Sequence, residues 1–245
     1  MYTPSLREEN GKVVGFTLLE LLIVIGIMVI LGTVLVLVLN PAETLKKSRD
    51  NQRISDLATM KTAIGLYTTT ITTPTLGTSA DGTTTLNNAS CQAGASWASE
   101  LGTGKIYYSY VGSADAITDA TLDGVTFTTN TNKPANSRTT NAIASATDGT
   151  GWLPVKFSDM TGGSPISAEP LDPTNTIGTL SAVASTDLTY RYACNADNLT
   201  FEIDAQLEST AYTSTSDKRA SDGGNNASYY EVGTNLSILG TGTDF

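Results

Sequence analysis

A long apolar run near the N-terminus constrains this chain more than any other feature. From Phe16 to Leu39 the only formally charged residue is Glu20. At a helical rise of 1.5 Å per residue the run would span about 36 Å, against a hydrocarbon core of roughly 30 Å. A cleavable secretory signal would have a shorter apolar core, and a buried core helix is the other alternative. We predict a membrane-spanning helix, because the run is apolar on every face.

A second helical pattern follows the apolar run. Asn40 is a suitable capping residue, and Pro41 suits the first position of a helix. Beyond them, apolar residues recur at spacings of three and four, which predicts a stripe along one helix face. The stripe consists of Ile54, Leu57, Met60, Ile64 and Tyr67. Such a stripe requires a second layer to cover it.

The chain after Tyr67 is rich in Thr, Ser, Gly and Asn, and its clearest signals are those of strands. We expect strands at residues 105–111 and 124–128, and a hairpin from Leu188 to Leu207. Turn residues between Asn195 and Asn198 separate the arms of the hairpin. Together with the helical segments, this pattern predicts an α+β fold in which a long N-terminal helix packs against an antiparallel sheet.

The second arm of the hairpin alternates regularly between apolar and polar residues. Phe201 and Ile203 alternate with Glu202 and Asp204. A period of two is expected when one face of a strand is buried and the other is in water. We therefore expect the apolar face to cover the helix stripe and the carboxylates to face solvent.

Composition argues against several classes of function. The formal net charge is −10, so the bulk surface is a poor partner for nucleic acid. Histidine is absent, which removes the commonest general base and a usual zinc ligand. No grouping of residues indicates a catalytic site, a metal site or a cofactor. We expect a protein that is not an enzyme.

Glu20 needs an explanation, because ionised side chains inside a membrane usually have a partner. No Lys or Arg lies between Phe16 and Asn40. Cleavage of the chain after Gly15 would place a new amino group on Phe16, four residues before Glu20 and about 6 Å away along a helix. That amino group would supply the missing positive charge.

The residues around this junction resemble a known signal. A short polar leader ends at Gly15 and is followed by Phe16-Thr-Leu-Leu-Glu20 and the apolar run, which is similar to the class III signal of type IV pilins and type II secretion pseudopilins. The resemblance implies cleavage between Gly15 and Phe16 by a prepilin peptidase and N-methylation of Phe16. It also implies that Glu20 docks the subunit into a growing filament, and that the fold is pilin-like.

The resemblance implies an organisation and a set of partners. We expect a leader at residues 1–15, a membrane and assembly helix at 16–39, its amphipathic continuation at 40–67 and a globular domain at 68–245. The implied partners are copies of the chain, other pilins, the peptidase, the inner-membrane assembly machinery and the lipid bilayer. The implied location is the cytoplasmic membrane, with the C-terminal domain outside, and then an extracellular pilus or a periplasmic pseudopilus.

Three alternatives remain open at this point. The basic residues that follow the span would place the C-terminal domain in the cytoplasm by the positive-inside count, against the resemblance. A pseudopilin of a secretion system fits the same signal as a surface pilin. From another class, a membrane-anchored enzyme or ligand-binding domain also fits a single span, as an ordinary anchor with a stray acid.

Two smaller features bear on the globular domain. Cys91 and Cys194 are the only cysteines, and in an oxidising compartment we expect a disulfide between them, with two buried thiols as the alternative. Acidic and amide residues in turn-rich loops offer oxygen ligands for calcium, but their spacing matches no EF-hand. We interpret these residues as solvated turn residues; they are Asp172, Asn175, Asp217 and Asp222.

Overall fold

The chain divides into two units, Met1–Thr44 and Leu45–Phe245. The computed structural model describes residues 15–78, 86–88, 91, 106–111, 121–122, 125–126, 144–177 and 186–240. Some sequence predictions fall outside the described residues. They concern the leader up to residue 14, Lys105, Gly124 and residues 127–128.

The first unit contains the apolar helix α1, Leu18–Leu39. Its large apolar side chains, where described, are each at least 46% exposed. Among the described residues, a single helical stretch, which begins at Leu18, is long and apolar enough to cross a membrane. Asn40 ends α1 in the left-handed region with φ 38°, a conformation that asparagine tolerates better than most residues.

Helix α2, Pro41–Thr70, begins directly after Asn40. The backbone N–H of Glu43 donates to the Asn40 carbonyl at 3.1 Å, and that of Thr44 donates to the same oxygen at 3.2 Å. The backbone thus confirms the prediction that a helix starts at this Asn-Pro pair. Proline at its first position costs no hydrogen bond, because that N–H would have no partner within the helix.

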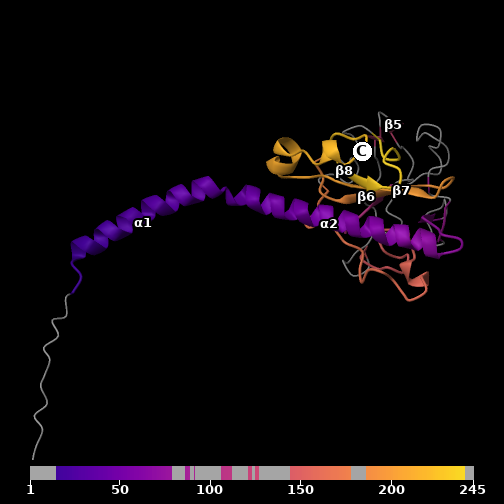
Figure 1. Cartoon of the computed structure of the whole chain (residues 1–245), viewed down its shortest axis with the longest axis horizontal. Helices are drawn as coiled ribbons and strands as arrows, with labels where there is room; N and C mark the ends of the chain where they lie inside the picture. Colours follow the sequence, from indigo (N-terminus) through magenta and orange to yellow (C-terminus); the bar gives the residue numbers. More distant parts are fainter. Residues whose placement is uncertain are drawn as a thin grey trace, which may run out of the picture. The chain divides into compact units, whose positions relative to one another are not determined.

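The second unit is built on a four-stranded antiparallel sheet with strand order β3-β6-β7-β8. Its strands are β3 (Tyr107–Tyr108), β6 (Tyr190–Asn195), β7 (Thr200–Ala205) and β8 (Tyr230–Gly233). Figure 1 draws β6, β7 and β8 alongside α2. Two further antiparallel pairs join β1 (Gly77–Thr78) to β2 (Leu86–Asn87) and β4 (Thr121–Leu122) to β5 (Val125–Thr126). Three short helical turns complete the described elements: η2 (Phe157–Asp159), η3 (Ala211–Thr215) and η4 (Arg219–Ser221).

The central hairpin of the sheet follows the sequence prediction. β6 and β7 pair antiparallel from Tyr190 opposite Ala205 to Asn195 opposite Thr200. The Asn195 side-chain oxygen accepts the backbone N–H of Asp197 at 3.0 Å, which closes the turn locally. The predicted hairpin and its Asn-rich turn are confirmed.

The apolar face of the sheet packs against α2. Four of the five stripe residues on α2 are buried in one core cluster with alternate residues of β6 and β7, while Ile54 is half-buried. These buried stripe residues are Leu57, Met60, Ile64 and Tyr67. Tyr67 also meets the ring of Phe157 edge-on, with centroids 5.9 Å apart. The structure therefore has the predicted α+β arrangement of a helix against an antiparallel sheet.

The opposite face of the sheet corrects a sequence prediction. Glu202 and Asp204, which we expected in solvent, are both fully buried. A second core cluster covers this face, with residues from β3, from the segment before β8 and from the C-terminal segment. Its members include Tyr108, Tyr229, Ile238 and Leu239. Strict alternation thus indicated two chemically different faces but not that both would be covered.

Buried charges on this face are matched across the strands. Arg191 on β6 lies directly opposite Asp204 on β7, and its Nε donates to the Asp204 carboxylate at 2.6 Å, while its Nη2 donates to the second oxygen. The guanidinium also stacks on the ring of Tyr229, 3.6 Å from the centroid. A bidentate, stacked arginine is the arrangement that best offsets the desolvation of both charges.

Glu202 anchors the C-terminal segment to the sheet. Its carboxyl oxygen accepts the backbone N–H groups of Ile238 and Leu239 at 2.7 and 2.8 Å. Burial, followed by the interaction with the neighbouring Glu231 carboxyl, raises the pKa of Glu202 well above its usual range. The raised pKa favours the neutral, protonated form of Glu202 in this buried position beside the Glu231 carboxyl.

A disulfide joins the loop-rich part of the domain to the sheet. Cys91 and Cys194 are bonded, and both are buried in the core that faces α2. The predicted pairing is confirmed. The neighbouring strand residue Tyr192 adds a hydrogen bond from its hydroxyl to the Leu76 carbonyl at 2.8 Å. The segments around residues 76 and 91 are therefore tied to β6 by a covalent bond and by a buried hydrogen bond.

Replacing Glu202 with Gln should make the unfolding free energy less sensitive to alkaline pH. The folded-state pKa of Glu202 is raised, so its contribution to stability is full below about pH 4.5 and falls as the pH rises above that value. Each pH unit in that range costs up to about 1.4 kcal/mol. Gln mimics the protonated acid and does not titrate. Thermal unfolding in detergent at about pH 5 and about pH 9 would measure the difference.

Asp197→Asn is the matched control, because Asp197 lies in the exposed hairpin turn. It should leave the pH dependence as in the wild type. An equal loss of stability from the acidic to the alkaline condition in wild type and Glu202→Gln would contradict a protonated Glu202.

Candidate functional site

The predicted cleavage junction lies just before α1. Gly15, Phe16 and Thr17 have no regular secondary structure, and α1 starts at Leu18. Phe16 is 86% exposed, and apart from the chain neighbours of Gly15 no described residue has an atom within 4 Å of the position that a Cβ on Gly15 would occupy. The junction thus lies outside regular secondary structure, and the described residues cover little of it.

Glu20 has partners within its own chain, which the sequence reasoning missed. Its carboxylate accepts the backbone N–H of Thr17 at 3.0 Å and the Thr17 hydroxyl at 2.9 Å. The Thr17 hydroxyl in turn accepts the backbone N–H of Glu20 at 3.2 Å. This reciprocal pattern is a capping box, whose signature Thr-x-x-Glu is visible in the sequence at this site. Thr17 is thus the N-cap residue of α1, and Glu20 completes the cap as its third helical residue.

The capping box leaves the charge of Glu20 without a counter-ion in α1. Thr17 donates through neutral groups, and no Lys or Arg lies between Phe16 and Asn40. Two hydrogen bonds reduce the cost of placing a carboxylate near a membrane, but a negative charge remains. The arrangement can therefore hold the carboxylate at the helix start and present it to a cation from outside the segment.

A second polar centre surrounds Arg53 on α2. The Arg53 guanidinium, fully buried, forms ion pairs with Asp50 at 2.9 Å, with Asp172 at 2.7 Å and with Glu208 at 2.7 Å. Arg49 binds the same Glu208 carboxylate through two nitrogens, at 2.7 and 2.8 Å. Hydrogen bonds from Arg49, and then from Arg53, lower the pKa of Glu208 to about 2. These five residues form the Arg53 network.

The Arg53 network ties three segments of the chain together. Asp50 accepts the backbone N–H groups of Glu208 and Ser209 at 2.9 and 2.8 Å, which fixes the chain that leaves β7. Asp172 accepts the backbone N–H groups of Thr174 and Asn175, which fixes the loop that carries it. Every carboxylate in the network is thus bound by N–H donors. The network is a structural clamp on α2.

This clamp corrects the interpretation of Asp172 as a solvated turn residue. Asp172 is buried and ion-paired, a long-range contact with α2 that local sequence cannot reveal. Asp217 pairs with Arg219, and Asp222 accepts the backbone N–H groups of Gly224 and Glu231. In the described part of the chain, no group of three or more acidic, Cys or His residues is arranged to hold a metal ion.

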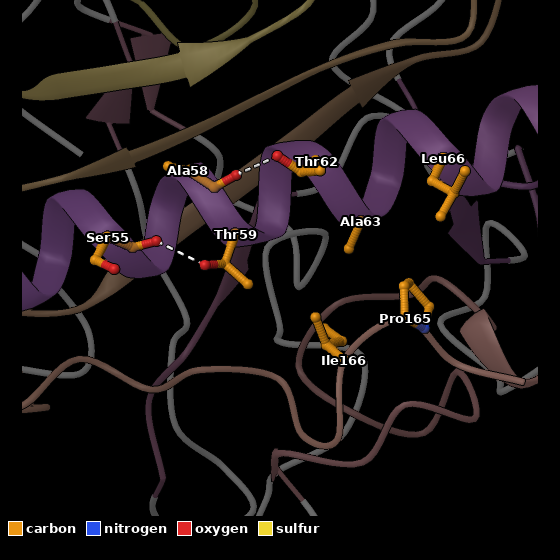
Figure 2. Close-up of a pocket in the computed structure, with 8 residues that line it drawn as sticks. All are labelled: Ser55, Ala58, Thr59, Thr62, Ala63, Leu66, Pro165 and Ile166. Atoms are coloured by element: carbon orange, nitrogen blue, oxygen red, sulfur yellow. Dashed lines mark hydrogen bonds between the residues drawn. The ribbon is translucent and has the colours of Figure 1, made fainter.

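A shallow groove runs along the outer face of α2 (Figure 2). It has a volume of about 380 Å³ and lies between α2 and the loop at Pro165 and Ile166. The hydroxyls of Thr59 and Thr62 donate to backbone carbonyls of their own helix, at 2.8 and 2.9 Å. The groove has no charged lining residue. It can accept an apolar side chain, and its hydroxyls, on Ser55, Thr59 and Thr62, have no charged or basic lining residue beside them to activate them.

The Arg53 network yields a stability prediction. Arg53→Met removes the buried cation and leaves Asp50, Asp172 and part of Glu208 without it, which should destabilise the protein by about 3–5 kcal/mol. Denaturant unfolding of the full chain in detergent would measure the change.

Arg49→Met is the control for this experiment. The Arg49 side chain is 34% exposed and contacts one of the three carboxylates, so its loss should cost about 1 kcal/mol or less. A similar loss of unfolding free energy in Arg53→Met and Arg49→Met would contradict the clamp, because the buried arginine would then matter no more than the partly exposed one.

Comparison with known proteins gives no further identification. No protein-family model, no curated protein and no solved structure matches this chain.

Proposed function

We propose that this chain is a structural subunit of a type IV pilus-like filament. In this proposal the chain is made as a single-pass membrane precursor, is cleaved after Gly15, is methylated on Phe16 and polymerises through α1. The single observation that carries the proposal is the position of Glu20. It is the only charge in an exposed apolar helix and lies one helical turn after an uncovered Gly15-Phe16 junction.

The exposed surface of α1 supports an assembly role. Before assembly its apolar side chains face lipid, and in a filament they would face copies of the same helix. Exchange of lipid contacts for protein contacts yields little hydrophobic gain, so packing and polar pairing must supply the driving force. Glu20 is the one group in α1 able to form a charge pair, and a cleaved Phe16 amino group from a neighbouring subunit is its proposed partner.

Two observations support an external location of the C-terminal domain. The disulfide between Cys91 and Cys194 suits an oxidising compartment. In addition, two of the four basic residues after the span, Arg49 and Arg53, are bound in the Arg53 network. These two arginines have a role in the folded domain, so their presence does not have to reflect retention in the cytoplasm.

Variants at Glu20 and Thr17 separate the two roles of the carboxylate. Glu20→Gln keeps an oxygen acceptor for the capping box and removes the charge, whereas Thr17→Val keeps the charge and removes the hydroxyl of the cap. If charge pairing drives assembly, cells with Glu20→Gln should contain at least tenfold less assembled protein than cells with the wild type. A tenfold change corresponds to a loss of about 1.4 kcal/mol in the free energy of assembly. Thr17→Val should assemble more protein than Glu20→Gln, and Glu20→Ala should resemble Glu20→Gln.

The measurement is the ratio of assembled to membrane-retained protein in cells that express each variant, with cleavage followed in the same samples. Cleavage should remain largely intact, because it depends on the Gly15-Phe16 junction. Normal assembly of Glu20→Gln, together with failure of Thr17→Val, would assign Glu20 to helix capping alone. Imaging of surface filaments before and after gene deletion distinguishes a pilin from a pseudopilin, since loss of secretion without visible filaments indicates the latter.

A further inference from the structure

Two lysines from distant parts of the chain flank one tyrosine ring. The Nζ of Lys47 on α2 lies 5.6 Å from the centroid of the Tyr212 ring, and the Nζ of Lys218 lies 5.8 Å from it. The Tyr212 hydroxyl donates to the side-chain oxygen of Asn51 at 2.7 Å, so the tyrosine is held against α2. Lys47, Tyr212 and Lys218 are called the lysine–tyrosine cluster below.

The backbone that carries Tyr212 and Lys218 is fixed to α2. Just before it, Ser209 donates its backbone N–H to the buried Asp50 carboxylate at 2.8 Å. Tyr212 lies in the π-helical turn η3, closed by a hydrogen bond from the Ser216 N–H to the Ala211 carbonyl at 2.9 Å. π-Helical turns are rare and often occur at functional sites. The cluster is therefore preorganised before any partner binds.

The two lysines differ from the arginines beside them in their ionic partners. Arg49 is paired with Glu208, and Arg219 is paired with Asp217. Within the described part of the chain, neither Lys47 nor Lys218 forms an ion pair with a carboxylate. Both residues are exposed. On a chain with net charge −10, the cluster thus offers two ammonium groups whose hydrogens are available to an anion.

The position of the cluster along the chain indicates where that anion lies. Lys47 lies eight residues after Leu39, the last residue of the apolar helix α1. From Pro41, where α2 begins, to Lys47 the helix rises about 9 Å over six residues. The polar headgroup layer of a bilayer is on the order of 5–8 Å thick on each side. Tyrosine is enriched at this interface, and lysines near it are attracted to anionic lipids. The Lys47 backbone therefore lies just beyond this layer if α1 is in a membrane, and its long side chain can extend back to the headgroups.

We propose that the lysine–tyrosine cluster binds the anionic headgroups of the membrane that α1 crosses. The phosphate oxygens accept hydrogen bonds from the two ammonium groups, and the Tyr212 ring occupies the interfacial layer beside them. These contacts hold the domain that carries the cluster at the lipid surface before assembly. They break when the subunit leaves the membrane for the filament. This inference rests on the proposed function, because it requires α1 to span a bilayer.

Amine-reactivity of the full chain in lipid nanodiscs tests the proposal. One set of discs contains phosphatidylcholine alone, and the other also contains phosphatidylglycerol. A membrane-impermeant acylating reagent modifies exposed lysines, and mass spectrometry of peptides gives the rate at each site. Acylation of Lys47 and Lys218 should slow roughly fivefold in the anionic discs, the effect expected for one lysine at such a surface. The protection should shrink at high salt.

Lys61 is an internal control on the same helix. It is exposed and lies fourteen residues beyond Lys47, about 21 Å along α2, further than the Debye length of about 10 Å at 0.1 M salt. Its acylation rate should be the same in both sets of discs. The proposal would be overturned if Lys47 and Lys218 were each acylated at the same rate in neutral and in anionic discs. It would also be overturned if Lys61 were protected as much as Lys47 and Lys218, since that would indicate a general effect of surface charge.

Matched variants give a second measurement. The double variant Lys47→Gln, Lys218→Gln should retain several-fold less phosphatidylglycerol than the wild type after extraction in mild detergent. The control double variant Lys61→Gln, Lys156→Gln changes the net charge equally and should retain the wild-type amount. Equal lipid retention by both double variants would contradict a specific role of the cluster.

The same samples separate this proposal from its rivals and from the proposed function. A chain that is not incorporated even into phosphatidylcholine discs would contradict the membrane-spanning role of α1 itself. Incorporation without lipid-dependent protection would overturn only the cluster proposal. Protection by added duplex DNA in neutral discs, or protection that rises with the number of chains per neutral disc, would reassign the cluster to nucleic acid or to a second copy of the chain.

Discussion

A lone carboxylate, Glu20, lies in the first turn of the apolar helix α1 and has to be stabilised there. Glu20 is the only charge from Phe16 to Leu39, and its two hydrogen-bond donors both belong to Thr17. A cap of neutral donors makes the carboxylate tolerable at the helix start but does not neutralise it. The remaining charge can be paired only from outside the helix, and in the proposed filament its partner is the amino group of another subunit.

In the second unit, Leu45–Phe245, buried charges are paired within the chain. Arg53 joins α2 to the loop at Asp172 and to the chain after β7, and Arg191 joins β6 to β7 through Asp204. The carboxylates that bind Arg53 also accept backbone N–H groups or a second arginine, and the Arg191 guanidinium also stacks on the ring of Tyr229. Such pairs contribute little net stability when intact, but removing one member is costly. They fix which loops lie against α2, including the loop that places Tyr212 beside Lys47.

Features with a local cause were predictable from sequence. The helix start at Asn40-Pro41 depends on capping, the buried stripe from Leu57 to Tyr67 depends on helical period, and the hairpin turn at Asn195 depends on residues within four positions. Features with a distant cause were not predictable. Asp172 is buried because Arg53, more than a hundred residues earlier, lies against it, and Glu202 is buried because the C-terminal segment covers it. The capping box at Thr17 has a local cause too, and its Thr-x-x-Glu signature can be read in the sequence.

We propose that processing after Gly15 creates the cation that Glu20 requires. The most direct test is the mass of the N-terminal peptide from protein purified from its native cells. We expect a chain that begins at Phe16 and carries one added methyl group on its amino nitrogen. A mature protein that still begins at Met1 would leave Glu20 without its proposed partner and would contradict the proposed charge pair.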